Sequence, residues 1–304
     1  MRRALSTSLS LAMLAAPLAA HVRLHQAQVK KIDKVEKLAD GVYVLFAEGG
    51  GNMELIVTDK HAILVDDQFA PLAPQLLKTI RGITDKPIKY LINTHYHQDH
   101  AGANPVLAGQ VQAIIATANA RTRLAAQQME MPADQRGGLP ELALGDSDPK
   151  VRALLTLHLD DLEVHLMHPA GPGHTDGDLV VGIPSKHVIH MGDLFFNGLT
   201  PYIDLKAGGS VKAMRERADE FLAWLPEDAK VIPGHGPVGA KKDYARFRDF
   251  LKAVEAHVAA HPGASGAELD ASFDHKAWSD YQGLGDFLTF AGFFDLAAGR
   301  QPKR

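Results

Sequence analysis

Three histidines and one aspartate lie close together in the segment Thr94-His95-Tyr96-His97-Gln98-Asp99-His100. Neutral imidazole nitrogens are the commonest side-chain metal ligands, and an aspartate adds a hard oxygen donor. The segment directly follows the apolar run Ile88 to Asn93, which predicts a buried strand. A solvated polar turn is the alternative interpretation, but a turn does not require imidazoles. The segment therefore predicts a metal site at the end of a strand.

Three later segments each place a residue able to bind a metal in a loop with glycine beside it. They are Pro172-Gly173-His174-Thr175-Asp176-Gly177-Asp178, Met191-Gly192-Asp193-Leu194 and Pro233-Gly234-His235-Gly236-Pro237. Glycine permits turns and close approaches that other residues do not. Any one of these segments could also be a plain turn, but the four segments together predict a metal centre. Its candidate ligands are His95, His97, Asp99, His100, His174, Asp193 and His235. We expect Asp176 and Asp178 to support these ligands or to cap the turn.

Short β-branched runs alternate with helical stretches around these segments. We expect strands at 41–47, 55–58, 62–65, 88–93, 111–116, 155–159, 162–167, 179–183, 187–190 and 230–232, and helices at 72–83, 118–129, 211–224 and 242–260. The cluster Gly49 to Asn52 predicts a hairpin tip, and Met131 to Pro149 an inserted loop, a type of segment that often forms a lid. Aromatic spacing after Glu268 indicates helical core packing. This alternation of strands and helices predicts an α/β protein of the α+β type, with a sheet-on-sheet core and helices outside.

Composition narrows the possible partners. The chain has 304 residues, of which 46% are hydrophobic and 22% charged, as in ordinary globular proteins. A net charge of -4 and the lack of long runs of like charge argue against nucleic acid as a partner, so we expect a small-molecule substrate. The absence of cysteine excludes disulfides, thiolate metal ligands and cysteine nucleophiles.

The first residues have the pattern of a secretory signal. Arg2 and Arg3 precede an apolar, small-residue stretch that ends at Ala19 and Ala20. The stretch is shorter than a membrane span needs. We expect residues 1–20 to be cleaved, leaving a periplasmic or secreted protein without a membrane anchor. Residues 21–265 would form the main domain, and residues 266–304 a C-terminal helical extension packed on it.

The four segments together resemble the pattern of the metallo-β-lactamase superfamily, in which H-x-H-x-D-H is followed by a His, an Asp and a last His. The resemblance covers about Lys37 to Ala260. It implies an αββα sandwich, two mixed sheets flanked by helices, with metals at one edge. It also implies that His95, His97 and His174 hold one metal, that Asp99, His100 and His235 hold the other, and that Asp193 bridges them.

This ligand set suits a hydrolase with two zinc ions, although manganese or iron could also bind. Two such ions lower the pKa of a bridging water to roughly 7, so that a metal-bound hydroxide can attack an amide- or ester-type carbonyl. We expect Asp99 to be a catalytic residue that orients this nucleophile or carries its proton.

The substrate is less well defined. The cysteine-containing β-lactamases have Cys where Asp193 stands and, three residues later, a carboxylate-binding Lys where Phe196 stands. Periplasmic β-lactam hydrolysis, and with it antibiotic resistance, is therefore one hypothesis, and a lactonase, thioesterase or other ester hydrolase is its equal. The Gly49 to Asn52 hairpin resembles a substrate-covering loop, with Met53 at its base, and the Met131 to Pro149 loop could form the opposite wall. Further pocket candidates are Phe195, Phe196, Asn197, Tyr202 and Asp204.

A non-enzymatic alternative also follows from the resemblance. With two iron atoms in the same ligand set, the superfamily includes oxygen-reducing electron carriers. These need a flavin partner, and no flavin-binding domain is recognisable in this sequence, so we favour the hydrolase.

Overall fold

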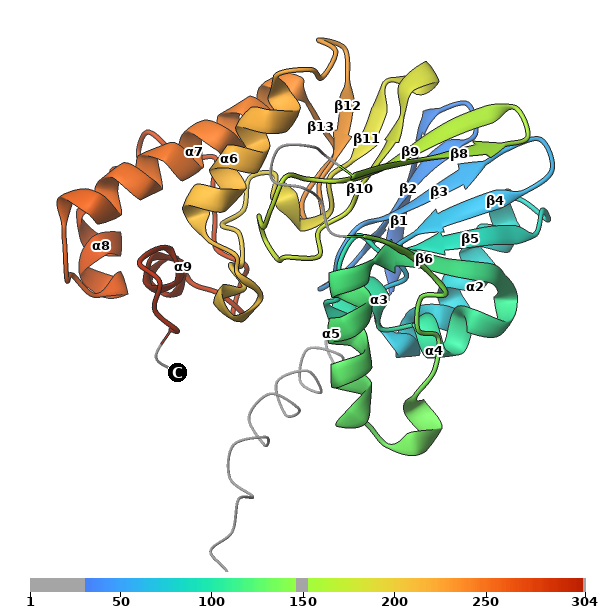
Figure 1. Cartoon of the computed structure of the whole chain (residues 1–304). Coiled ribbons are helices and arrows are strands. Elements are labelled where there is room, and N and C mark those ends of the chain that lie inside the picture. The colour runs from blue at the N-terminus through green and yellow to red at the C-terminus, as the bar shows by residue number, and fades with distance from the viewer. Residues whose placement is uncertain (1–30, 146–152, 303–304) are drawn as a thin grey trace, which may run out of the picture.

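Two β-sheets lie face to face, and helices cover the outer face of each (Figure 1). The structure, a computed structural model, describes residues 31–145 and 153–302. The predicted signal at 1–20 and the end of the predicted loop Met131 to Pro149 lie outside the described residues. Among the described residues, no helix has the length and apolar character needed to cross a bilayer.

The first sheet has seven strands in chain order. They are β1 (Ile32–Ala39), β2 (Val42–Ala47), β3 (Met53–Val57), β4 (Ala62–Val65), β5 (Ile88–Ile92), β6 (Val111–Thr117) and β7 (Leu142–Leu144). Strands β1 to β4 are antiparallel, and β4 to β7 are parallel. Parallel neighbours place their carboxyl ends at the same edge, and this edge carries the first histidine segment.

The second sheet has six strands in the order β13-β12-β11-β10-β9-β8. They are β8 (Ala153–Leu159), β9 (Leu162–His168), β10 (Val180–Ile183), β11 (Val188–His190), β12 (Lys230–Ile232) and β13 (Gly239–Ala240). Only β11 and β12 pair in parallel, and the other neighbours are antiparallel. The loops after β11 and β12 therefore emerge side by side.

The helices form two outer layers. Their bounds are α2 (Ala73–Ile83), α3 (Gln98–Ala101), α4 (Asn104–Leu107), α5 (Ala118–Met129), α6 (Val211–Leu222), α7 (Lys241–Ala260), α8 (Gly266–Ser272) and α9 (Phe290–Ala297). Helices α2 to α5 lie with the first sheet, and α6 to α9 with the second (Figure 1). The ring of Phe250 in α7 stacks on Tyr281 and Phe293, at centroid distances of 4.1 and 5.8 Å, and so joins the C-terminal segment to α7.

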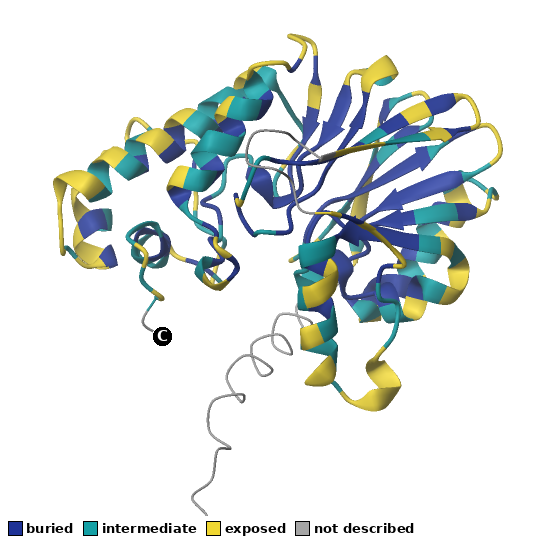
Figure 2. Cartoon of the chain, in the orientation of Figure 1, coloured by how far each residue is buried: buried dark blue, intermediate teal, exposed yellow. Residues whose placement is uncertain are grey.

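Strand alternation explains the layers. In β3, Ile56 belongs to the core between the sheets, whereas Leu55 packs with Leu76 and Ile80 of α2. In β11, Val188 faces the other sheet, whereas Ile189 belongs to the core beneath α6 and α7. Figure 2 shows the resulting buried strands between partly exposed helices. The predicted αββα sandwich of two mixed sheets is thus confirmed.

Three strands were not predicted: β1, β7 and the two-residue strand β13. Four of the eight residues of β1 are charged, so its sequence has no apolar run, and it lies at an edge. Strand β7 falls inside the stretch predicted to be an irregular loop. It exists because Leu142 to Leu144 pair with Ile115 to Thr117 of β6, a contact that local periodicity does not reveal.

Candidate metal centre

All seven predicted ligands lie at one edge of the sandwich. His95 and His97 follow β5, and the short helix α3 begins at Gln98 and carries Asp99 and His100. His174 lies in the loop between β9 and β10, Asp193 follows β11, and His235 follows β12. Because β11 and β12 are parallel, their loops bring Asp193 and His235 together.

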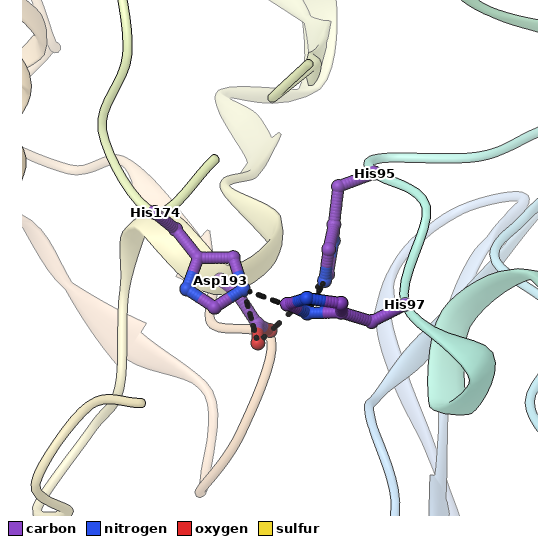
Figure 3. A group of neighbouring side chains, drawn as sticks. All are labelled: His95, His97, His174 and Asp193. Atoms are coloured by element: carbon purple, nitrogen blue, oxygen red, sulfur yellow. Dashed lines mark hydrogen bonds and ion pairs between the residues drawn. The ribbon is translucent and has the colours of Figure 1, made fainter. Parts of the chain in front are cut away.

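The first group contains His95, His97, His174 and Asp193, whose side chains converge on one point (Figure 3). Nδ1 of His97 lies 3.1 Å from Nε2 of His95 and 3.0 Å from Nε2 of His174. An Asp193 oxygen lies 3.4 Å from Nε2 of His174 and 3.8 Å from that of His95. Spacings of this size are those of ligand atoms that surround a common ion at about 2.0–2.2 Å.

Each imidazole of this group is held by its second nitrogen. Nδ1 of His95 lies 3.1 Å from the Thr94 hydroxyl, and Nδ1 of His174 lies 2.9 Å from the Tyr202 carbonyl. Nε2 of His97 lies 3.0 Å from the Asp204 carboxylate, to which the Tyr96 hydroxyl also donates. Such contacts fix the tautomer and aim the other nitrogen at the ion position.

The second group contains Asp99, His100 and His235. Nε2 of His235 lies 3.3 Å, and that of His100 3.6 Å, from an Asp99 oxygen. The other Asp193 oxygen, Oδ1, lies 3.1 Å from Nε2 of His100 and 3.5 Å from that of His235. The two oxygens of Asp193 thus face the two groups, as expected of a bridging carboxylate.

Burial and charge set the protonation states of these side chains. Burial lowers the pKa of His174 to about 4. The pKa of His95 is well below its usual value, mainly because of burial and to a smaller extent because of the nearby charge of His100. Both imidazoles are therefore neutral, as ligands must be. Burial would also lower the pKa of His235, but the facing carboxylates Asp193 and Asp99 outweigh it and raise the pKa to about 9.

The residues fit metal ions on structural grounds as well. Nε2 of His100 and Oδ1 of Asp193 are buried and lie 3.1 Å apart, but neither forms a hydrogen bond of good geometry among the described residues, a costly state that an ion between them would relieve. Two glycines leave space for the ligands. A Cβ atom at Gly234 would overlap Oδ1 of Asp193, and one at Gly51 would overlap the ring of His100. This His/Asp cluster is therefore suited to divalent metal, most readily zinc.

Supporting residues surround the ligands. Asp66, at the end of β4, accepts from the Thr94 amide at 2.7 Å, and its Oδ2 lies 2.6 Å from Nδ1 of His100. Asp178 accepts from the His174 amide at 2.8 Å and from the Thr175 hydroxyl at 2.6 Å, which confirms its turn-capping role. Asp176 instead forms a bidentate pair with Arg123 at 2.6 Å.

A second polar pair lies between the sheets. Glu54 of β3 and His190 of β11 are fully buried, with Oε2 and Nδ1 3.9 Å apart, and their polar atoms have no hydrogen-bond partner among the described residues. Burial, with a contribution from Asp66, raises the pKa of Glu54 to about 8. Burial lowers the pKa of His190 to about 4. Both groups are therefore uncharged near pH 7.

A cavity of about 970 Å³ opens above the ligands. Asp99, Asp193, His97 and His235 line it, together with Phe196, Tyr202, Asp204 and residues 49, 50 and 52 of the hairpin. Three pocket predictions differ from the structure. Met53 points away from the cavity into the core under α2, because it alternates with Glu54 along β3. Asn197 donates to the Pro237 carbonyl at 2.9 Å, and Phe195 packs on Tyr244 and Phe247.

The wall opposite the hairpin also differs from the prediction. No residue of the described part of the 131–149 loop lines the cavity, whereas residues 282–285, Phe287 and Gln301 do. Sequence reasoning also missed Asp66 and Lys206. Asp66 could have been found, since the pair Asp66-Asp67 follows a strand parallel to the one that precedes the histidines. Lys206 has no comparable local signal.

Comparisons with known proteins agree with the fold and the ligand pattern. Residues 47–235 match the family model described as the metallo-beta-lactamase superfamily. The chain is 25% identical over 227 residues to a type 2 metallo-beta-lactamase of Bacteroides fragilis, covering 70% of this chain and 84% of that protein. It is 29% identical over 203 residues to hydroxyacylglutathione hydrolase GloC of Haemophilus influenzae, covering 66% and 92%.

Solved structures show the same architecture. A metallo-beta-lactamase from Pontibacter korlensis superposes with a TM-score of 0.60 at 20% identity, covering 72% of this chain and 98% of that one. The family model spans more than half of the chain. With the fold and the ligand cluster in agreement, this chain belongs to the metallo-beta-lactamase superfamily.

Proposed function

We propose that this chain is an exported hydrolase that uses two divalent ions, zinc in the first place, to cleave an amide- or ester-type carbonyl compound. The observation that carries the proposal is the position of Asp193, whose two oxygens face the two ligand groups at the base of an open cavity. Such a pair of ions, when bound, would supply Lewis acidity and would favour deprotonation of an attacking water at neutral pH.

Asp99 has a catalytic role in this proposal. Asp99 lines the cavity and faces His235 and His100. Burial alone would raise its pKa, but these imidazoles outweigh burial and hold the pKa well below its usual range. Asp99 is therefore ionised, and a carboxylate oxygen that faces the cavity can orient the attacking water by accepting a hydrogen bond from it.

The surroundings of the site bear on the substrate. Phe196 occupies the position of the lysine that binds the substrate carboxylate in the cysteine-containing β-lactamases. Its ring stacks on His235 with a centroid distance of 5.0 Å, so this position carries no positive charge. Lys206 is the only lysine or arginine among the described residues that line the cavity. A β-lactam carboxylate would have Lys206 as its available cationic partner. Hydrolysis of β-lactams and hydrolysis of esters, thioesters or lactones are both compatible with this arrangement, and the similarity to GloC supports the second group.

One experiment tests the proposal. The mature protein is analysed for metal and then assayed with a chromogenic cephalosporin, a carbapenem, an acyl-lactone, a thioester and a phosphodiester. We expect about two metal ions per chain and chelator-sensitive turnover of at least one carbonyl substrate. A protein that binds metal but hydrolyses only the phosphodiester, or none of the panel, would contradict the proposal. N-terminal sequencing of the protein secreted or released from the periplasm tests export, which predicts a chain beginning near His21.

A further inference from the structure

One side of the cavity is apolar and is built by two segments that lie far apart in the sequence. We call it the apolar wall and define it as Phe196, Leu199, Tyr202, Leu284 and Phe287. The first three residues follow Asp193, and the last two belong to the segment between α8 and α9. All five line the same cavity as the ligands.

The apolar wall begins at the ligands themselves. The Tyr202 ring lies 5.8 Å from the His97 ring and 6.1 Å from the His174 ring, and its carbonyl lies 2.9 Å from Nδ1 of His174. The same ring also lies 5.6 Å from the ring of Phe287. A group attached to the reacting carbonyl would therefore meet Tyr202 first and the C-terminal segment next.

The C-terminal part of the wall is fixed in place. Leu199 and Gln282 form a β-bridge in which the Thr200 amide donates to the Gln282 carbonyl at 2.8 Å, and the Gln282 amide to Gly198 at 3.0 Å. The Leu284 amide donates to the Leu288 carbonyl at 2.9 Å. Leu284 and Phe287 remain half-buried and border the cavity. The wall is therefore a preformed surface.

Size and polarity indicate what the wall receives. About 970 Å³ lies near the upper end of the range for small-molecule sites and far exceeds what an acetyl group occupies. Apolar side chains gain affinity by removing apolar ligand surface from water, by about 25 cal/mol per Å². A substrate with only a small acyl group would leave the wall in contact with water.

We propose that the site selects carbonyl substrates with an extended apolar acyl group, and that Leu284 and Phe287 determine this specificity. The inference rests on the proposed hydrolase function. The acyl chain would lie along Tyr202 and reach Leu284 and Phe287, while its carbonyl faces the ligand cluster. Contact with these side chains would hold the scissile bond in position, so that remote binding contributes to turnover.

The first test uses S-methyl thioesters from acetyl to octanoyl, which share one small leaving group. Because the chain has no cysteine, released methanethiol can be followed with a thiol reagent that does not react with the protein. With the zinc-loaded enzyme, kcat/KM is expected to rise about two- to fourfold per methylene until the cavity is filled, since full burial of one methylene corresponds to about fourfold.

Variants locate the effect. In the double variant Leu284→Ala/Phe287→Ala the rise with chain length should flatten to less than about 1.5-fold per methylene, whereas the metal content should stay the same. The matched control is Trp224→Ala, which removes a partly exposed apolar ring outside this cavity. This control should keep the full chain-length dependence. Equal dependence in the wild type and the double variant would overturn the inference.

A second readout separates this inference from the proposed function. Binding of acetate, hexanoate and octanoate to the zinc-loaded protein is measured by calorimetry, which requires no turnover. Octanoate should bind at least about tenfold more tightly than acetate, and the double variant should lose this preference. Chelator-sensitive turnover with no chain-length preference in either assay would leave the hydrolase standing and overturn the inference. Wall-dependent octanoate binding without turnover of any thioester, lactone or β-lactam would support the wall and overturn the proposed function.

Discussion

The ligand cluster and the apolar wall border the same cavity, but they are held in different ways. In the first group each imidazole contacts a polar partner through its second nitrogen, and Asp193 is buried between the two groups. The wall depends on packing and on one β-bridge between distant segments. Losing one hydrogen bond to a ligand therefore misplaces a metal, whereas losing one wall side chain only enlarges the cavity. Reaction and substrate selection should be separable by mutation.

The largest effect should come from removing a ligand. His97→Ala or Asp193→Ala should lower kcat/KM by at least about a thousandfold and reduce the metal content, because a whole ligand is lost from the cluster. Metal analysis and thioester turnover check both parts. His165→Ala, which removes a histidine paired with Glu163 at the surface, is the control and should retain both. A fully metallated and active Asp193→Ala protein would refute the ligand assignment.

A smaller effect should follow from Asp204, which contacts a ligand and lines the cavity. Asp204→Asn keeps the shape and the cap on the following turn but removes the charge facing Nε2 of His97. Metal affinity should fall about 10- to 100-fold, as is typical when a partner of a metal-bound histidine is changed. Competition with a chromogenic chelator measures this. An unchanged metal affinity would show that Asp204 does not position His97 for metal binding.

The buried carboxyl group of Glu54 should make the stability of the protein depend on pH. Its pKa is about 8 in the folded protein against an ordinary value of 4.5, so the folded state holds a proton that the unfolded state releases between these values. This group therefore makes stability fall as pH rises from 4.5 to 8. Glu54→Gln removes that decline, and the stability of the variant relative to the wild type should increase by at least about 1.4 kcal/mol between pH 5 and 8.

Urea unfolding of the metal-free protein in chelator provides the measurement. His190, with a pKa lowered to about 4, has the opposite dependence, since its contribution to stability grows as pH rises from 4 to 6.5. It is present in both proteins, so the difference between them isolates Glu54. Parallel stability curves for the wild type and the variant would contradict the buried neutral carboxyl group.

The smallest effect is expected at Lys206, the exposed cation of the cavity. Lys206→Ala should raise KM about threefold for a carboxylated cephalosporin and leave a neutral thioester unaffected, because an exposed ion pair contributes about 1 kcal/mol or less. The measurement is the KM of the wild type and the variant for both substrates, at low and high salt. Equal changes for the two substrates would indicate a general effect on the loop.

The ligand cluster could be predicted because its signal is local. His95 to His100 lie in one short segment after an apolar strand, and the other ligands stand in glycine-rich loops. The apolar wall could not be predicted, because the β-bridge between Leu199 and Gln282 is what brings Phe287 to Tyr202 and Leu284 to the same cavity. Their aromatic and aliphatic character fits core packing equally well, and Phe293 and Phe294 of the same region are indeed buried.

Errors at Met53 and in strand β7 have a similar origin. Met53 stands next to the hairpin in sequence, but strand alternation turns it toward α2, and only the position of that helix identifies the face as core. Leu142 to Leu144 become a strand because β6 offers a free edge.

The close approach of glycine backbones to the ligands has a consequence for genetic screens. Any side chain at Gly234 would overlap Asp193, and any at Gly51 would overlap His100. In a saturation mutagenesis experiment both positions would score as intolerant as the histidines, although neither contributes a functional group. Their pattern would differ in one respect: even alanine would be rejected, since the excluded atom is the first carbon that all other amino acids share. Intolerance to alanine at a glycine thus marks the space reserved for the ligands.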